Sequence, residues 1–295
     1  MALMPFDDRD GSIWINGEMI PWREATSHTL SHGLHYASTV FEGERVYSGV
    51  IFKGREHTER LRRSCEMLDF ELPLSDDEVD TAKMAVVEAN GIVDGYVRAF
   101  AWRGSEMMAI SAQHTTTHVA IAAWEWPSYF DPETKMKGIT LDIADWKRPS
   151  PESAPVHAKA AGLYMICTLS KHAAEKKGFQ DALMLDYRGY LAEATGANVF
   201  FVDKEGTIHT PIADCFLDGI TRRTVIALAE SLQMKVVQRH LTLDDLSEMT
   251  ECFLTGTAAE VTPVSQIGDA SFTPGDISRQ LVDGYENLVR GRIAL

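Results

Sequence analysis

One lysine in the middle of the chain stands among apolar residues. Lys159 lies in the stretch VHAKAAGLYMI, which follows a stiff loop containing Pro149, Pro151 and Pro155. Such a lysine is usually a surface side chain whose stem lies along apolar neighbours and whose ammonium stays in water. The alternative is a lysine kept partly dry, so that its nitrogen loses its proton more readily and acts as a nucleophile. Other parts of the sequence have to decide between the two.

A phenol and a carboxylate accompany this lysine along the chain. Tyr164 follows Lys159 within the same apolar stretch, about one and a half helical turns further on. Glu193 stands between apolar residues in YLAEATGANVFF, at the end of an expected strand. A carboxylate at such a place is either exposed on a sheet edge or buried and paired with a cation.

Two further segments have the features of anion sites. CFLDGITRRTVIALAE passes from a glycine turn into a helix, with Arg222 and Arg223 in its first turn. Positive charge at a helix N-terminus opposes the helix dipole and is better tolerated when an anion binds there. The alternative is a pair of solvated surface arginines. In FLTGTAAEVTP an expected strand ends in Thr255-Gly256-Thr257, where backbone N–H groups and two hydroxyls could bind an anion. The alternative is an ordinary turn at the end of a strand.

One ligand needs all of these groups together. Pyridoxal 5'-phosphate has an aldehyde for an amine, a phenolic oxygen for a tyrosine, a ring nitrogen for a carboxylate, and a phosphate for an anion site. We therefore predict that the chain binds pyridoxal 5'-phosphate through Lys159, with Tyr164 and Glu193 at the ring.

A metal site is not expected. His28, His32 and His35 in SHTLSHGLHY have the spacing of one helix face. Gly33 weakens a helix there, however, and no carboxylate or cysteine lies within the stretch, so turn and capping roles are favoured.

Composition and charge exclude several kinds of partner. The chain has 295 residues, 45% of them hydrophobic, and a formal net charge of −15 without a lysine- or arginine-rich run. This argues against nucleic acid or an anionic membrane as the main partner. The absence of a long apolar stretch and of signal-peptide features in MALMPFDDRDG, and four widely spaced cysteines, predict a cytoplasmic protein with reduced thiols.

The elements that must position these residues mix strands and helices without regular βαβ alternation. Asn16-Gly17 between apolar flanks predicts a hairpin, and Ser75 with Glu78 forms a capping box at the start of a helix. The mixture favours an α+β fold. The turn-rich segment PSYFDPETKMKG predicts a linker over 127–137 between an N-terminal domain (1–126) and a C-terminal domain (138–295).

The ordered motifs resemble the fold-type IV pyridoxal-phosphate aminotransferases, and among them the branched-chain amino acid aminotransferases. The resemblance implies a small N-terminal α/β domain, a larger C-terminal mixed domain as in D-amino acid aminotransferases, and the cofactor between them. The matching stretches run through nearly the whole chain: NGEMIPW, SHGLHYASTVFEGERVY, EHTERLRRS, YVRAFAW, AKAAGLY, EATGANVF, LDGITRRTVI and FLTGTAAEVTPV.

The same resemblance implies the roles of the cofactor-binding residues. Lys159 would form the Schiff base and shuttle the proton, Glu193 would pair with the protonated ring nitrogen, and Leu217 would pack on the ring. The implied cofactor contacts are Arg60, Lys159, Tyr164, Glu193, Leu217, Ile220, Thr221, Gly256 and Thr257. The phosphate is expected on Arg60, the helix start at Ile220 and Thr221, and Thr257.

The substrate pocket is likewise implied by the resemblance. An apolar wall is expected from Phe41, Trp126 and Tyr129. A distal carboxylate is expected at Tyr36, Arg98 and the backbone of Ile110, and the α-carboxylate at Tyr96, Thr257 and Ala258. The chain departs from the family pattern where Ala109 replaces a glycine, where EATGAN replaces EGAGEN, and where Arg103 lies near the 108–110 loop.

The resemblance implies transamination of leucine, isoleucine and valine with 2-oxoglutarate, giving branched 2-oxo acids and L-glutamate. It also implies a homodimer or a larger homo-oligomer. Alternatives are a D-amino acid or (R)-amine transaminase, an aminodeoxychorismate lyase, and a protein that binds the cofactor without catalysis. Retention of both Lys159 and Glu193 argues against the last, because mere binding needs neither a base nor an electron sink.

Overall fold

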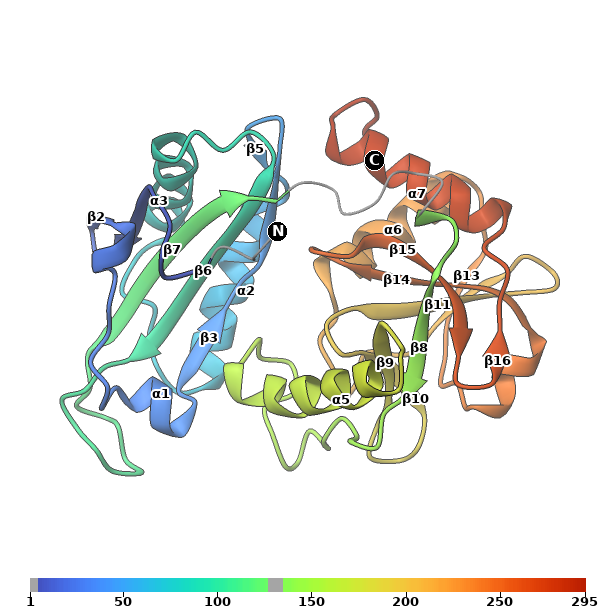
Figure 1. The fold of residues 1–295 in the computed structure, drawn as a ribbon, viewed down its shortest axis with the longest axis horizontal. Helices are drawn as coiled ribbons and strands as arrows, with labels where there is room; N and C mark the ends of the chain where they lie inside the picture. Colours follow the sequence, from blue (N-terminus) through green and yellow to red (C-terminus); the bar gives the residue numbers. More distant parts are fainter. Residues whose placement is uncertain (1–4, 127–134) are drawn as a thin grey trace. The chain divides into compact units, whose positions relative to one another are not determined.

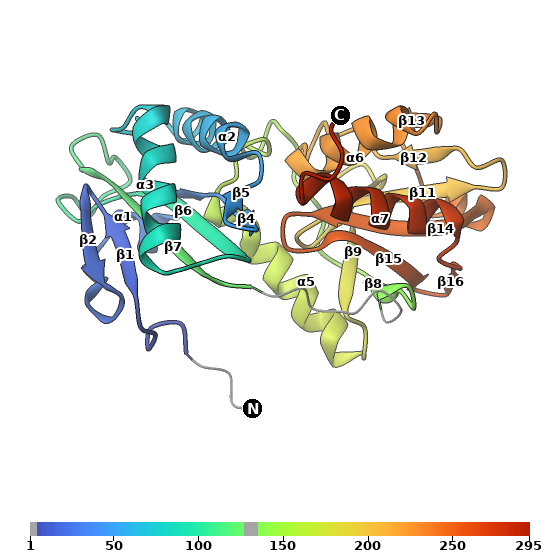
Figure 2. The same cartoon turned by 90° about the horizontal axis from the view of Figure 1, so that it is seen from above.

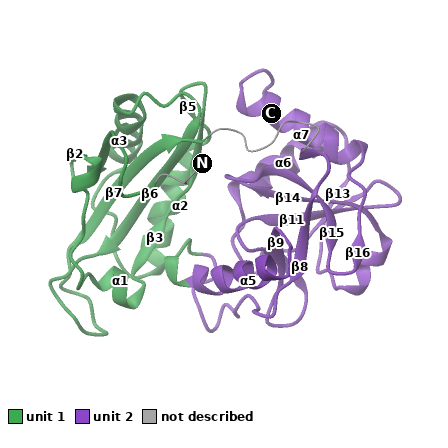
Figure 3. Cartoon of the chain, in the orientation of Figure 1, with its two compact units in different colours: residues 1–127, 158–162 green, residues 128–157, 163–295 purple. Residues whose placement is uncertain are grey.

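The computed structural model describes residues 5–126 and 135–295. The chain divides into two compact units (Figure 3). The first comprises Met1–Pro127 and Ala158–Gly162, and the second Ser128–His157 and Leu163–Leu295. The expected linker at 127–137 falls mostly outside the described residues, so this domain boundary stays a prediction.

The first unit contains a seven-stranded sheet, as far as residues 5–126 describe it. Its order is β2-β1-β7-β6-β4-β5, and β3 also pairs with β6. All of these pairings are antiparallel. The strands are β1 Ser12–Ile15, β2 Glu18–Pro21, β3 Thr39–Phe41, β4 Glu44–Tyr47, β5 Val50–Ile51, β6 Gly95–Arg103 and β7 Thr117–Glu125.

Two helices cover one face of this sheet, α2 (Gly54–Met67) and α3 (Asp76–Ala89) (Figure 2). Their apolar side chains form one core with inward-facing residues of β3, β4, β6 and β7. A short helix, α1 (His32–Tyr36), and a 3-10 turn, η1 (Trp22–Glu24), precede β3.

Two local predictions in this unit are confirmed. Asn16 and Gly17 form the two-residue turn of the β1–β2 hairpin, both with positive φ. The Ser75 side chain accepts a hydrogen bond from the N–H of Glu78, whose carboxylate accepts one from the N–H of Ser75. These reciprocal bonds start α3 where the sequence indicates.

The second unit is built on a nine-stranded mixed sheet, counted over residues 135–295. Its order is β10-β9-β8-β15-β14-β11-β12-β13, with β16 beside β15. Because β10 also pairs with β11, the run from β10 to β11 closes into a barrel around an apolar core. The strands are β8 Ile139–Ile143, β9 Asp181–Leu185, β10 Leu191–Ala194, β11 Asn198–Asp203, β12 Ile208–Thr210, β13 Val236–Gln238, β14 Met249–Gly256, β15 Glu260–Ile267 and β16 Ala270–Ser271.

Over residues 135–295, three α-helices lie around this barrel (Figure 1). α5 (Met165–Lys176) lies along β8 and β9, while α6 (Ile220–Ser231) and α7 (Asp276–Val289) pack together against β14 and β15. The 3-10 segment η3 (Asp244–Glu248) also belongs to this unit. A second such segment, η2 (Ala161–Tyr164), begins in the part of the chain that belongs to the first unit and leads directly into α5.

Parallel and antiparallel pairs occur in one sheet, and helices do not alternate regularly with strands. The predicted α+β class is therefore confirmed. The four cysteines are free and buried. Among the helices that the structure describes, none is long and apolar enough to cross a membrane.

Candidate active site

The segment that carries Lys159 is held by the first unit. Ala160 forms an isolated bridge with Val40 of β3, and the N–H of Phe41 donates to the carbonyl of Lys159 at 3.1 Å. The N–H of Lys159 donates to Ser64 Oγ on α2 at 3.0 Å. The lysine is half-buried, and its Nζ lies 4.8 Å from the centroid of the Phe41 ring. The sequence did not indicate that this five-residue segment would join the N-terminal unit.

Two other expected substrate residues lie beside Phe41. The Arg98 guanidinium is 4.5 Å from the centroid of the Phe41 ring, and its Nη2 donates to Tyr96 Oη at 3.4 Å. Arg98 Nε is buried and makes no hydrogen bond within the described residues. Gly43 is needed nearby because a side chain there would overlap Tyr96 Oη. The structure thus brings together Phe41, Tyr96, Arg98 and Lys159.

Arg60 is held by a buried acid that the sequence reasoning did not single out. Its Nε and Nη2 donate to the two oxygens of Glu42 at 2.6 and 2.8 Å, and His57 Nδ1 lies 2.7 Å from the same carboxylate. Burial alone would raise the pKa of Glu42, but the charges of Arg60 and His57 bring this pKa well below its usual range. Arg60 and Ser64 lie one turn apart on α2, so one helix face holds both Arg60 and the Lys159 backbone.

The histidines of the SHTLSHGLHY stretch hold turns together. His32 is buried and bonds Ser38 Oγ and Ala109 O, each at 2.9 Å. His35 Nε2 lies 2.8 Å from Thr29 O, and His28 Nδ1 accepts from the N–H of Leu30. His28 and His35 thus have the turn role that was favoured, whereas His32 joins α1 to a distant loop.

α1 and the 104–116 loop are fastened to each other in the first unit. His32 bonds Ala109, and the buried Arg103 donates from Nη1 to Ala112 O at 2.7 Å. Two expected substrate residues on these elements are exposed: Tyr36 with 43% and Ile110 with 83% of their surface accessible. Trp126 accepts a hydrogen bond at its carbonyl from Arg45 Nη2, and Tyr129 lies outside the described residues.

In the second unit, Glu193 lies on β10 at the closure of the barrel. It is 9% exposed, and Asn198 Nδ2 on β11 donates to its Oε2 at 3.2 Å. Arg148 Nε lies 3.3 Å from its Oε1. Of the two interpretations that the sequence left open, the buried carboxylate paired with a cation is the one observed. Arg148 was missed because it stands in a loop far from Glu193 in sequence.

Asn198 also connects Glu193 to the loop before α6. Its Nδ2 donates to the carbonyl of Leu217 at 3.0 Å, and a Cβ on Gly219 would overlap its Oδ1. Glu193, Leu217 and the start of α6 at Ile220 are therefore tied together through one amide.

The start of α6 carries no capping side chain and no acid in its first turn. Arg222 is buried and donates to Asp218, Pro211 O and Gln238 at 2.7 to 2.9 Å, and Arg223 Nη1 donates to Asp218 O at 3.1 Å. Arg222 is therefore not a solvated surface arginine, and its guanidinium is taken up by Asp218 and neighbouring groups of the chain rather than left for a bound anion. Thr221 is buried in the same turn.

The turn between β14 and β15 holds Thr257, which is half-buried, and Ala258, which is exposed. A Cβ on Gly256 would lie 3.3 Å from both Ala197 Cβ and Gly196 O, so the strand end packs closely on the Glu193–Asn198 connection. Thr255 Oγ1 is buried without a hydrogen-bond partner in the part of the chain that the structure describes.

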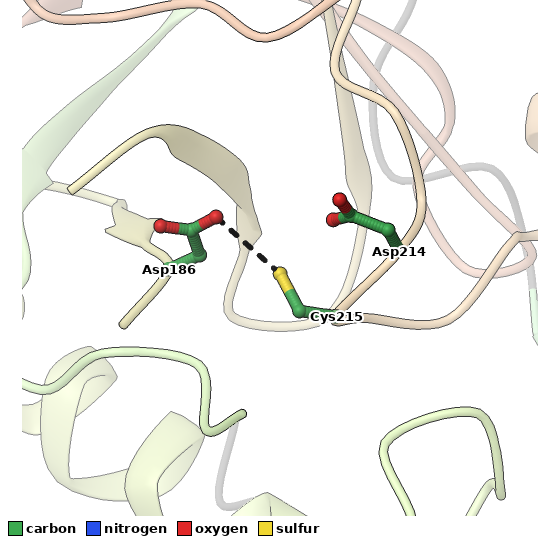
Figure 4. Close-up of side chains that lie close together, drawn as sticks. All are labelled: Asp186, Asp214 and Cys215. Atoms are coloured by element: carbon green, nitrogen blue, oxygen red, sulfur yellow. Dashed lines mark hydrogen bonds between the residues drawn. The ribbon is translucent and has the colours of Figure 1, made fainter. Parts of the chain in front are cut away.

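One cluster has the composition of a metal site: Asp186, Asp214 and Cys215 (Figure 4). Cys215 Sγ lies 3.6 Å from Asp186 Oδ2. Arg188 Nη2, however, donates to both carboxylates at 2.7 to 2.9 Å. Burial and the two acids raise the pKa of Cys215 to about 12, so the thiol is a poor ligand. The arginine already supplies the positive charge that this cluster needs.

Comparison with known proteins identifies the family of this chain. The family described as amino-transferase class IV matches residues 39–267, and the chain belongs to the class IV aminotransferases. A probable branched-chain-amino-acid aminotransferase of Rickettsia conorii is 42% identical over 294 residues, covering 98% of this chain and all of the relative.

Solved structures of a branched-chain amino acid aminotransferase from T.th. are also similar. The form with pyridoxamine 5'-phosphate is 38% identical with a TM-score of 0.93, and covers 97% of this chain and 96% of the other. The form with N-(5'-phosphopyridoxyl)-L-glutamate is 37% identical with a TM-score of 0.92 and the same coverage. The fold-type IV resemblance is confirmed.

Proposed function

We propose that this chain is a branched-chain amino acid aminotransferase that uses pyridoxal 5'-phosphate. It transfers the amino group of leucine, isoleucine or valine to 2-oxoglutarate. The observation that carries the proposal is the half-buried Lys159, held by its backbone in a chain of the class IV aminotransferase family. Similarity to enzymes named for branched-chain amino acids supports the substrate class.

The residues present fit this cofactor in three respects. Glu193 is a buried carboxylate with hydrogen-bond and charge partners, as a partner of a protonated ring nitrogen needs. α6 begins with an uncapped turn, which favours an anion at its first N–H groups. Beside Gly256, the buried hydroxyl of Thr255 has no partner among the described residues.

We assign the cofactor contacts accordingly. Lys159 would hold the aldehyde carbon, Tyr164 the phenolic oxygen and Glu193 the ring nitrogen. Leu217 would pack on the ring. The phosphate would be held by Arg60, Ile220, Thr221, Gly256 and Thr257.

Pyridoxal phosphate, when bound, supplies an aldehyde for amines and an electron-poor ring that accepts the electron pair released at the substrate Cα. Lys159 Nζ would accept the proton from the substrate Cα and, in the reverse half-reaction, would give a proton back to Cα. Its backbone bonds to Phe41 and Ser64 fix the base of its side chain. Glu193 would keep a proton on the ring nitrogen, and Arg60, whose guanidinium Glu42 orients, would hold the phosphate.

Two unlike substrates have to use one pocket in turn. Phe41, Trp126 and Tyr129 form the apolar wall for a branched side chain in this proposal. Arg98, Tyr36 and the backbone of Ile110 meet the second carboxylate of glutamate, and Tyr96, Thr257 and Ala258 hold the α-carboxylate. Support comes from the Arg98 guanidinium, which lies against Phe41 and has an unbonded, buried Nε within the described chain.

The active form is proposed to be a homodimer or larger homo-oligomer in the cytoplasm. The net charge of −15 makes nucleic acid or an anionic membrane an unfavourable partner.

Borohydride reduction tests the cofactor assignment. Purified protein with bound pyridoxal phosphate should be yellow, and reduction followed by proteolysis should leave the label on the peptide that contains Lys159. Lys159→Arg serves as the matched control and should give no such peptide. Label on another lysine, or none on the parent protein, would refute the mechanism.

A half-reaction screen tests the substrate class. Cofactor absorbance is followed with L-leucine, L-glutamate, D-alanine or an (R)-arylamine as the single amine. We expect reaction with L-leucine and L-glutamate but not with D-alanine or the arylamine. Faster reaction with D-alanine or the arylamine would replace this proposal with a transaminase of the other stereochemistry.

A further inference from the structure

Arg148 is a buried cation to which the proposed reaction has so far given no role. It is 4% exposed and stands after β8, in the loop that leads to the proline-rich segment. Its main chain is fixed, because its N–H donates to Leu185 O at 2.8 Å and it forms a bridge with Asp186. A buried guanidinium is costly unless a charge or hydrogen bonds compensate it.

The charge that compensates Arg148 is Glu193. Arg148 Nε lies 3.3 Å from Glu193 Oε1, and the two side chains are 5% and 12% exposed. Asn198 Nδ2 occupies the other oxygen at 3.2 Å. Each partner would be expensive to bury alone, so the ion pair favours the charged form of Glu193, whose carboxylate lies between Arg148 and Asn198. The contact to Arg148 is electrostatic, because its Nε makes no hydrogen bond within the described residues.

The other end of Arg148 reaches the turn before α5. Its Nη1 lies 3.5 Å from Leu163 O and 3.5 Å from Cys167 Sγ. Burial raises the pKa of Cys167 to about 11 although Arg148 opposes this shift, so the thiol stays neutral and does not compete with Glu193 for the charge. Leu163 directly precedes Tyr164, so one guanidinium contacts the supports of two expected cofactor residues.

We propose that Arg148 is a positioning residue for cofactor binding: it acts through Glu193, holding this carboxylate ionised and aimed so that it can pair with a protonated ring nitrogen. The inference rests on the proposed function. It adds that the strength of the contact to the ring nitrogen depends on a side chain that does not itself touch the cofactor.

A double-mutant cycle tests whether Arg148 acts through Glu193. The four proteins are the parent, Arg148→Gln, Glu193→Gln and the double variant. Apoprotein is titrated with pyridoxal phosphate and the dissociation constant is measured from the quenching of intrinsic fluorescence. Urea unfolding of each apoprotein is recorded in parallel, so that loss of fold is seen separately.

Arg148→Gln is expected to weaken binding about tenfold or more, because Glu193 is left buried without its cation. In the Glu193→Gln background the same change should alter binding less than about twofold. Arg148→Lys, which keeps the charge but not the planar fork, should recover part of the affinity.

A matched control is Arg239→Gln, which removes an ion pair to Asp245 in the same unit. It should leave the affinity for pyridoxal phosphate unchanged.

Each outcome decides one question. Equal losses for Arg148→Gln in both backgrounds would overturn the inference, since Arg148 would then act independently of Glu193. An unchanged affinity in a folded Arg148→Gln protein would overturn it as well. A parent protein that does not bind pyridoxal phosphate would instead refute the proposed function.

Discussion

The two carboxylate oxygens of Glu193 have different partners, Arg148 for one and Asn198 for the other. The negative charge of Glu193 is what holds a proton on a ring nitrogen in the proposed mechanism. Glu193→Gln keeps the shape and removes the charge. Proton abstraction from L-leucine should slow on the order of a hundredfold, while the amino acid concentration at half saturation changes little.

Stopped-flow absorbance of the half-reaction measures both quantities. A Glu193→Gln variant that reacts at the parent rate would show that Glu193 has another role.

Arg98 is the residue that should separate the two substrate classes. Arg98→Ala removes a charge-assisted partner that only glutamate needs, because leucine has no second carboxylate. The loss in kcat/KM should be about 2–4 kcal/mol for L-glutamate and much smaller for L-leucine. Separate half-reactions with each amino acid give the two values. Equal losses would place Arg98 on the shared α-carboxylate or in a structural role.

The roles of single residues could be predicted from the sequence where a motif contains them. They could not be predicted where the role depends on a partner far away in the chain. Lys159 and Glu193 stand out as polar groups in apolar surroundings. Arg148 and Glu42 do not, because their importance comes from pairs that only the folded chain forms. Neither of the two interpretations left open for the arginines at the start of α6 fits Arg222, because Asp218 and the carbonyl of Pro211 compensate its charge.

At the scale of elements, α2, α3 and β4 are joined by a buried ion pair. Lys83 on α3 donates to Glu44 of β4 at 2.8 Å and to Thr58 of α2 at 2.6 Å. Lys83 is 1% exposed, and burial raises the pKa of Glu44 although Lys83 opposes this shift. Neither charge reaches water easily, so each depends on the other.

Lys83→Met should therefore destabilise the protein by about 3–5 kcal/mol, because it leaves the Glu44 carboxylate buried without a cation. Urea unfolding followed by circular dichroism measures this loss. The double variant Lys83→Met with Glu44→Gln should regain part of the lost stability, because the buried charge is then removed. The control Lys204→Met breaks an exposed pair with Glu248 and should change stability little. A Lys83→Met protein as stable as the parent would contradict this prediction and show that Glu44 does not depend on Lys83.

Elements defined by local chemistry were predictable, and those defined by tertiary contacts were not. The Asn16-Gly17 hairpin and the capped α3 need only neighbouring residues. α1 forms although Gly33 weakens a helix, and the position needs a glycine because a Cβ there would lie 2.9 Å from Trp102 Cβ. The closure of the barrel through β10 and β11 likewise depends on packing that no single segment displays.

On the scale of the whole molecule, we expect an assembly of at least two chains. α1 and the 104–116 loop expose large apolar side chains, with Leu34 71% and Ile110 83% accessible. The homo-oligomer that the resemblance implies would cover these side chains. Light scattering coupled to size exclusion should give the mass of a dimer or larger, and a fully active monomer would contradict this. Ile110→Asp should shift the protein towards monomer and reduce its activity.

The first unit is discontinuous along the chain, because Ala158–Gly162 belongs to it while the preceding residues from Ser128 belong to the second. During synthesis the N-terminal part of the first unit is therefore complete long before the segment with Ala160, which bridges to Val40, leaves the ribosome. Although domains usually fold in the order in which they are synthesised, the first unit cannot be completed until a segment that follows part of the second unit has been synthesised. A gene divided at residue 127 would yield two fragments, and neither would encode the complete first unit.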